Sequence, residues 1–194
     1  MSLSTPSIAL FGGSFDPIHE GHIQLIETVK DCLNIEEIHL IPCKQSPHKR
    51  HTPLASDSHR LQMCRMACRS LEFVYINPIE LESTAEEPSY SWKTVMHYQR
   101  LHPEVKLYWI LGVDQWEKLH LWDNYEFLIK SLHFIVLERQ AKPSHKLDRQ
   151  FTVLPFDNEV SSSAIRMHWS AGGVVKGLTQ EVRDYMVRHE LYIN

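Results

Sequence analysis

The sequence predicts an α/β fold in which helices cover both faces of a mostly parallel sheet. Two observations carry this prediction. Six short apolar runs alternate with segments of helical periodicity, and a glycine pair, Gly12 and Gly13, directly follows the first run. With 194 residues, 43% of them hydrophobic, the chain is long enough for one domain over 1–194 with a substantial core.

The six apolar runs are the expected strands, and they lie at 7–11, 37–41, 73–77, 106–111, 133–138 and 151–154. Apolar residues at helical spacing predict helices at 21–33, 57–71, 91–101, 115–120, 124–130, 162–171 and 179–189. Ser56 or Asp57 can cap the second helix, and Thr179 can cap the last. The polar segment 141–150 is expected to be a surface crossover. Strands that alternate with helices in this way are typical of a single-domain, Rossmann-like, doubly wound sheet.

Composition and charge exclude several classes of protein. The net charge of −4 argues against a general nucleic-acid or membrane binder, which needs a broad positive field. Cys32, Cys43, Cys64 and Cys68 form no C-x-x-C pair, and no apolar leader or long apolar run is present. We therefore expect a cytoplasmic protein with reduced thiols. Cys64 and Cys68 are expected to pack in the core.

The segment 12–22, G-G-S-F-D-P-I-H-E-G-H, joins the first strand to the first helix and predicts an anion site. Free backbone N–H groups and the positive end of the helix dipole meet there, and His19 and His22 can both donate to a bound phosphate. The segment matches neither the dinucleotide-binding fingerprint nor a Walker A loop. The alternatives are a tight turn with two ordinary histidines, or a zinc site, for which a third ligand with suitable spacing is missing.

Two further loops carry polar groups at the ends of expected strands. Residues 42–51 form a cationic loop in which Lys44, His48, Lys49 and Arg50 can hold phosphate, although a charge run is usually a solvated surface. After the fourth strand, Gly112 allows close backbone approach to a ligand. Asp114 can then bind a ribose hydroxyl, cap the next helix, or do both.

Two more segments are open to two interpretations each. Trp122 can stack on a flat heteroaromatic ring or pack in the core, and the same holds for Tyr90, which is followed by Ser91 as a candidate helix cap. The run 160–166, V-S-S-S-A-I-R, is either a second anion cradle in which Arg166 clamps a phosphate, or a helix cap with surplus serines.

Taken together, these loops resemble those of bacterial nicotinate-nucleotide adenylyltransferases, which belong to the nucleotidyltransferase superfamily with the HxGH motif. The resemblance rests on G-G-S-F-D-P-I-H-E-G-H, P-C-K-Q-S-P-H-K, S-Y-S-W-K-T, G-V-D followed by Trp, and V-S-S-S-A-I-R, in this order over residues 7 to about 192. It implies one nucleotidyltransferase domain that transfers AMP from ATP to nicotinate mononucleotide in NAD biosynthesis.

The resemblance also implies a site. His19, His22 and Arg166 would be catalytic and hold the ATP phosphates. The remaining ATP contacts would come from Gly12, Gly13, Ser14, Phe15, Gly112, Asp114, Ser162, Ser163 and Ile165. The nicotinate nucleotide would contact Lys44, His48, Lys49, Tyr90, Ser91 and Trp122. Mg²⁺ would arrive with ATP, and no protein-bound metal is expected.

Two positions depart from the usual family pattern. Ser46 and Pro47 stand where two prolines are usual, and Ser91 stands where threonine is usual. Three alternatives stay open at this point: the same reaction on nicotinamide mononucleotide, adenylylation of phosphopantetheine, and a nucleotide-binding sensor without turnover. A homo-oligomer is also left open.

Overall fold

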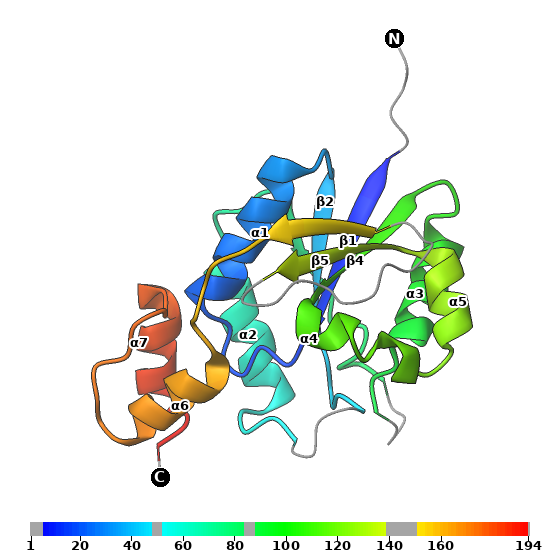
Figure 1. The fold of residues 1–194 in the computed structure, drawn as a ribbon. Helices are drawn as coiled ribbons and strands as arrows, with labels where there is room; N and C mark the ends of the chain where they lie inside the picture. The colour runs from blue at the N-terminus through cyan, green and yellow to red at the C-terminus, as the bar shows by residue number, and fades with distance from the viewer. Residues whose placement is uncertain (1–5, 48–51, 84–87, 139–150, 194) are drawn as a thin grey trace.

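The computed structural model describes residues 6–47, 52–83, 88–138 and 151–193 (Figure 1). Within these ranges, six strands form one sheet in the order β3-β2-β1-β4-β5-β6. All five pairings are parallel, which confirms the predicted doubly wound sheet. The strands are β1 Ser7–Gly13, β2 Glu37–Pro42, β3 Val74–Ile76, β4 Lys106–Gly112, β5 His133–Glu138 and β6 Phe151–Pro155.

Strand order reverses between β1 and β4. The chain builds outward from β1 through β2 to β3 and then crosses back, so that β4 pairs with β1 on its other side. The connections on the two sides of this point leave in opposite directions, which opens a crevice at the carboxyl ends of β1 and β4. As far as the structure describes them, the loops that carry the polar motifs of the sequence lie at this edge.

Helices cover both faces of the sheet (Figure 1). On one face lie α1 Glu20–Cys32, α2 Asp57–Ala67, α6 Ser162–Ser170 and α7 Gln180–Arg188, and on the other lie α3 Ser91–Leu101, α4 Val113–Trp116, the 3-10 turn η1 Leu119–Leu121 and α5 Tyr125–Ser131. A hydrophobic core lies on each face of the sheet, and alternate side chains of β1 point into the two cores. Ala9 and Phe11 pack in the core beneath α1 and α2, and Ile8 and Leu10 pack in the core beneath α3. None of the helices described here has the length and apolarity to cross a membrane.

The two expected core cysteines, Cys64 and Cys68, are buried free thiols on α2 and at its C-terminal end. Burial raises the pKa of the Cys68 thiol to about 12, so it stays protonated and inert at neutral pH. Their predicted packing role is confirmed. Two predicted caps are also confirmed, since Ser56 accepts from the N–H of His59 on α2 and Thr179 accepts a matching bond on α7.

Some predicted boundaries were wrong. The helix expected over 115–120 is two short pieces, α4 and η1, because the backbone bonds after Glu117 span three residues, from Lys118 to Gln115 and from Leu121 to Lys118, and not the four of an α-helix. The helix expected over 57–71 ends at Ala67, and the third strand is shorter than 73–77. The predicted crossover 141–150 lies outside the described residues.

A substitution at Gly177 tests whether the connection between α6 and α7 stabilises the start of α1. Its carbonyl accepts from the N–H of Glu20 (2.8 Å), its φ is +84°, and a Cβ there would lie 2.6 Å from Cγ1 of Val160. We expect Gly177→Ala to lower the free energy of unfolding by about 2–3 kcal/mol, since left-handed strain and overpacking add. Denaturant unfolding measures it.

Gly172 is the matched control. Its φ is +69°, but an added Cβ would meet no neighbouring atom within 4 Å, so Gly172→Ala carries only the backbone strain of about 1 kcal/mol. Equal losses for the two substitutions would contradict the packing argument at Gly177.

Candidate active site

Two adjoining cavities open at the carboxyl edge of the sheet. The α6-side cavity has a volume of about 670 Å³ and includes His22, Ser162 and Arg166 in its lining. The α3-side cavity has a volume of about 230 Å³ and is lined partly by Tyr90 and Trp122. Both share the walls formed by Gly12, Gly13, Ser14, Asp114 and Gln115. Two ligands seated in these cavities would therefore meet over the end of β1.

The turn between β1 and α1 is held by donors from distant parts of the chain. Four of its backbone carbonyls accept hydrogen bonds from donors on α2, on α6 and just after β2, which keeps these partly negative groups occupied. An anion at this turn then meets fewer competing acceptors. The bonds run from Cys43 N–H to Gly13 (2.9 Å), Arg60 Nη1 to Ser14 (2.6 Å), Arg166 Nη1 to Asp16 (2.5 Å) and Ser162 Oγ to Pro17 (2.9 Å).

The two histidines of the motif have different positions. His19 is the N-cap residue of α1 and is only 3% exposed, whereas His22 lines the α6-side cavity. Their rings stack with centroids 3.7 Å apart, and the backbone N–H of His19 donates to Nδ1 of His22 (3.2 Å). In a neutral imidazole this bond leaves the proton on Nε2, so His22 presents a donor at its far edge.

The serine run before α6 caps that helix and also borders the α6-side cavity. Ser161 is the N-cap and accepts from the N–H of Ala164 (3.2 Å), while Ser162, Ser163 and Arg166 line the α6-side cavity. Arg166 also donates to Oγ of Ser163 (3.4 Å). The serine that caps the helix is thus a different one from the two that line the cavity.

Ile165 does not line either cavity, although the sequence analysis assigns it to ATP. Its side chain is 3% exposed within the core, and its N–H donates to the carbonyl of Ser161 (3.0 Å). We leave Ile165 out of the site, because helix formation uses its amide and core packing uses its side chain.

Asp114 lies at the border of the two cavities. The N-cap of α4 is Gly112, and Asp114 sits in the first turn without capping the helix, so the capping interpretation was wrong. A Cβ on Gly112 would lie 2.7 Å from Oδ1 of Asp114. The glycine therefore lets this carboxylate fold back against the end of β4, where it is exposed to both cavities.

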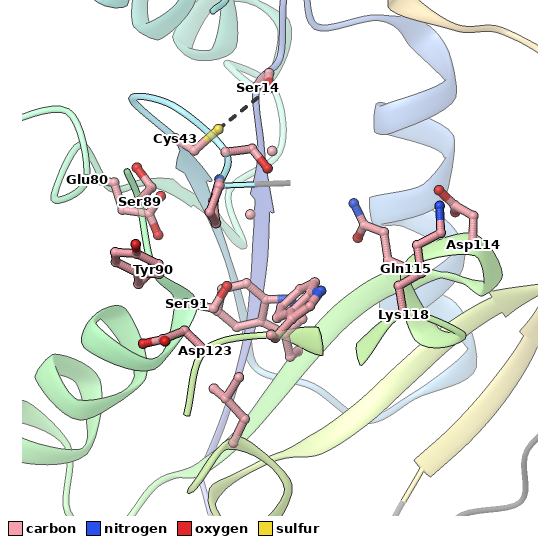
Figure 2. Close-up of a pocket in the computed structure, with 17 residues that line it drawn as sticks. Ser14, Cys43, Glu80, Ser89, Tyr90, Ser91, Asp114, Gln115, Lys118 and Asp123 are labelled. Carbon is pink, nitrogen blue, oxygen red and sulfur yellow. Dashed lines mark hydrogen bonds between the residues drawn. The ribbon is translucent and has the colours of Figure 1, made fainter. Parts of the chain in front are cut away.

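The start of α3 opens on the α3-side cavity (Figure 2). The N-cap is Tyr90, no side chain caps the helix, and its first turn contains no acidic residue. The positive end of the helix dipole is thus directed at the cavity. Ser91 is the first helical residue rather than the cap, and both Tyr90 and Ser91 line the cavity.

Trp122 forms an aromatic wall on the same cavity. It is half-buried and meets Trp109 edge to face, with ring centroids 6.1 Å apart and an interplanar angle of 84°. Trp122 thus packs against the core and also lines the cavity, so part of its indole is accessible for stacking on a flat ring.

The predicted cationic loop is only partly described. Lys44 does not line a cavity: its ammonium donates to the carbonyl of Ser83 (2.9 Å), and its backbone N–H donates to Oγ of Ser89 (3.0 Å). Lys44 thus ties the loop after β2 to the segment before α3. His48 and Lys49 lie outside the described residues.

Several lining residues were missed by the sequence analysis. Figure 2 shows Gln115 and Lys118 beside Asp114 on one side of the α3-side cavity, and Glu80 and Ser89 on the other. Lys118 follows Asp114 by four residues, the spacing of one helical turn, and this signal could have found it; Gln115 is the immediate chain neighbour of Asp114. Also missed were Ser46, Pro47, Trp109 and Asp123.

Glu80, on the wall of the α3-side cavity, carries a carboxyl with a raised pKa. It accepts from Oγ1 of Thr94 (2.6 Å), but burial outweighs this bond and raises the pKa of the carboxyl. Asp123, by contrast, is exposed and accepts from the indole N–H of Trp92 (2.7 Å).

The described part of the chain contains no cluster of side chains that could bind a metal ion. No group of three or more His, Cys, Asp or Glu side chains lies close enough together there to hold an ion.

Comparisons with known proteins agree with this geometry. The sequence model of the cytidylyltransferase-like family matches residues 10–168. A "Probable nicotinate-nucleotide adenylyltransferase" of Methylacidiphilum infernorum is 33% identical over 96% of this chain and 92% of its own length. A protein of the same name from Geobacillus kaustophilus is 33% identical over 95% and 85%.

Solved structures share the fold. The Plasmodium falciparum nicotinic acid mononucleotide adenylyltransferase complexed with NaAD superposes with a TM-score of 0.79 at 22% identity, over 96% of this chain and 97% of that one. The same enzyme complexed with APC gives a TM-score of 0.78 with the same coverage.

Glu80 gives a pH-dependent prediction. A carboxyl with a raised pKa binds its proton more tightly in the folded state, so its stabilising contribution is present at low pH and is lost as pH rises through that pKa. Gln cannot ionise. We therefore expect Glu80→Gln to melt at a higher temperature than the parent at pH 7. The gap between the two melting temperatures should close as pH falls below about 4.5, the ordinary pKa of a glutamate carboxyl.

Thermal unfolding between pH 4 and pH 8 measures this gap. The exposed neighbour Glu82 is the matched control, since Glu82→Gln removes a solvated charge and should change the melting temperature little. A gap for Glu80→Gln that stayed constant over the whole range would refute the burial argument.

Proposed function

The chain belongs to the cytidylyltransferase-like family and, within it, to the nicotinate-nucleotide adenylyltransferases, and on this basis we propose that it transfers AMP from ATP to nicotinate mononucleotide. The products would be deamido-NAD and pyrophosphate, in NAD biosynthesis. The observation that carries the proposal is the pair of cavities that share the end of β1, one with phosphate-binding groups and one with an aromatic wall and a helix N-terminus. Residues 1–194 would form a single nucleotidyltransferase domain.

ATP would occupy the α6-side cavity. Its volume of about 670 Å³ falls within the range of roughly 300–1,000 Å³ that is usual for ligand sites. Nε2 of His22, the guanidinium of Arg166 and the hydroxyl of Ser163 would hold the phosphates, with His19 positioning His22 from behind. Backbone groups of residues 12–15 would hold the α-phosphate, and Gly112 and Asp114 would lie against the ribose.

Nicotinate mononucleotide would occupy the α3-side cavity. Trp122 would stack on the pyridine ring, and Tyr90 and Ser91 would bring the N-terminal amides of α3 to the carboxylate. The carboxylates of Glu80, Asp114 and Asp123 make net charge a poor source of affinity for an acid, so these positioned N–H donors would carry the preference. His48 and Lys49 remain candidates for the phosphate of this substrate.

The chemistry needs no strong base. The attacking phosphate monoester has a second pKa of about 6 and is already largely dianionic at neutral pH. One of its oxygens forms a bond to the α-phosphorus of ATP while the bond from that phosphorus to the bridging oxygen of the β-phosphate breaks, and pyrophosphate leaves. His22 and Arg166 would stabilise the charge that develops on the departing pyrophosphate.

Mg²⁺ would be bound mainly by ATP and water, since the described residues offer no cage of carboxylates. When bound, the ion would neutralise phosphate charge.

The substrate assignment is tested by a pyrophosphate-release assay with ATP and three acceptors. We expect nicotinate mononucleotide to exceed nicotinamide mononucleotide and phosphopantetheine in kcat/KM by about 10²-fold or more, because donors placed for a carboxylate are left mispaired by an amide. Equal efficiency with the acid and the amide would remove the nicotinate assignment. Binding of ATP without pyrophosphate release from any acceptor would instead indicate a sensor.

His22→Ala and Arg166→Ala test the phosphate site. Each removes a donor from the developing charge, so kcat should fall by about 10²-fold while KM for nicotinate mononucleotide stays within about threefold. Steady-state kinetics with ATP saturating measure both constants. Ser162→Ala in parallel removes a hydroxyl that is already committed to the carbonyl of Pro17, and should cost less than either. Parent-like turnover in His22→Ala or Arg166→Ala would contradict the assigned roles.

A further inference from the structure

Asp16 collects donors from three separate segments beside the α6-side cavity. Its side chain is 7% exposed. Oδ2 accepts from the N–H of Leu54 (2.8 Å), and Oδ1 accepts from the N–H of Ala55 (3.0 Å) and from the hydroxyl of Tyr192 (2.7 Å). Three hydrogen bonds fix the plane of this carboxylate.

Arg166 rests against the same residue. Its Nη1 donates to the backbone carbonyl of Asp16 (2.5 Å) and lies 3.7 Å from Oδ2, while its side chain is 25% exposed. The guanidinium is therefore located by two oxygens of Asp16, one from the backbone and one from the side chain. Because Leu54 also lines this cavity, Asp16 ties a wall segment and the arginine together.

Tyr192 reaches this point from the end of the chain. In Figure 1 the C-terminal end lies beside α6 and α7. The carbonyl of Leu191 accepts from the indole N–H of Trp169 (3.0 Å), a residue of α6, and Tyr192 has a φ of +61°. Burial and the Asp16 carboxylate raise the pKa of the Tyr192 hydroxyl, so it remains a donor at physiological pH.

We propose that Tyr192 and Asp16 are positioning residues for the proposed adenylyl transfer: the Tyr192 hydroxyl orients the Asp16 carboxylate, and this carboxylate orients the guanidinium of Arg166 toward the ATP phosphates. The inference rests on the proposed function. Neither side chain touches the reacting atoms in this scheme. Without the hydroxyl, Oδ1 keeps one N–H donor, the carboxylate can rotate, and Arg166 loses one of the two Asp16 oxygens that locate it.

The test is Tyr192→Phe, alone and combined with Arg166→Ala. We expect Tyr192→Phe to lower kcat about tenfold with KM for nicotinate mononucleotide unchanged within about twofold, and to weaken ATP binding in calorimetric titration. In the Arg166→Ala background the same substitution should change kcat less than about twofold, because the residue through which it acts is gone.

The matched control is Tyr185→Phe. Tyr185 loses a comparable hydrogen bond, the one between its hydroxyl and Nδ1 of His59 (2.9 Å), on α7 and away from both cavities. Its kcat should equal that of the parent. An equal loss of kcat for Tyr192→Phe in the parent and Arg166→Ala backgrounds, or no loss in either, would overturn the proposal and leave Tyr192 a purely structural residue.

Asp16→Asn is a second test of the same inference, because asparagine keeps one acceptor oxygen but removes the negative charge beside Arg166. We expect a larger loss of kcat than for Tyr192→Phe, again absent in the Arg166→Ala background. If the parent protein bound ATP but released no pyrophosphate with any acceptor, the proposed function would fail separately. The inference would then be decided by whether Tyr192→Phe weakens ATP binding only when Arg166 is present.

Discussion

The site depends on how the turn between β1 and α1 is held. A short segment that passes from a strand to a helix exposes carbonyls as well as amides, and only the amides suit a phosphate. Donors from three other parts of the chain bind the carbonyls, the largest being the fully buried guanidinium of Arg60 on Ser14. The Ser162 hydroxyl does the same for Pro17 and ties the start of α6 to the turn before α1. The shape of the proposed anion site thus depends on the whole fold and not on the glycine motif alone.

Strand order then decides what lies on each side of this turn. Because β2 and β4 flank β1, the loops after these strands border the same residues, Gly12 to Ser14, from opposite sides. The two faces of the sheet separate the cavities: α6 with its arginine borders one cavity, and α3 with its uncapped N-terminus borders the other. A reaction between two phosphate-bearing molecules needs their phosphates at one point and their distal groups apart, and the switch point supplies both conditions.

The sequence predicts those parts of the molecule whose signals are local. The strands, the HxGH turn and the serine run before α6 are recognisable because their residues are contiguous and their spacing is regular. Asp16 and Arg60 were missed because their roles come from partners far along the chain, such as Tyr192, and no local pattern records those contacts. Lys44 and Ile165 lie in matching motifs, yet their own packing turns them away from the cavities. Motif membership identifies the loop, and only the tertiary contacts decide which of its side chains face the ligand.

The carboxylate of Asp16 beside Arg166 raises a question of charge. In the proposed role of Arg166, an acidic group next to the arginine reduces the attraction for ATP and pyrophosphate alike. Attraction that is equal in substrate and product states does not raise kcat, and it slows release of a trianionic or tetra-anionic product. A guanidinium already fixed by two oxygens loses less side-chain entropy on binding and meets the developing charge without rearrangement. The arrangement therefore exchanges net affinity for orientation, which is the quantity that an in-line transfer between two bound phosphates requires.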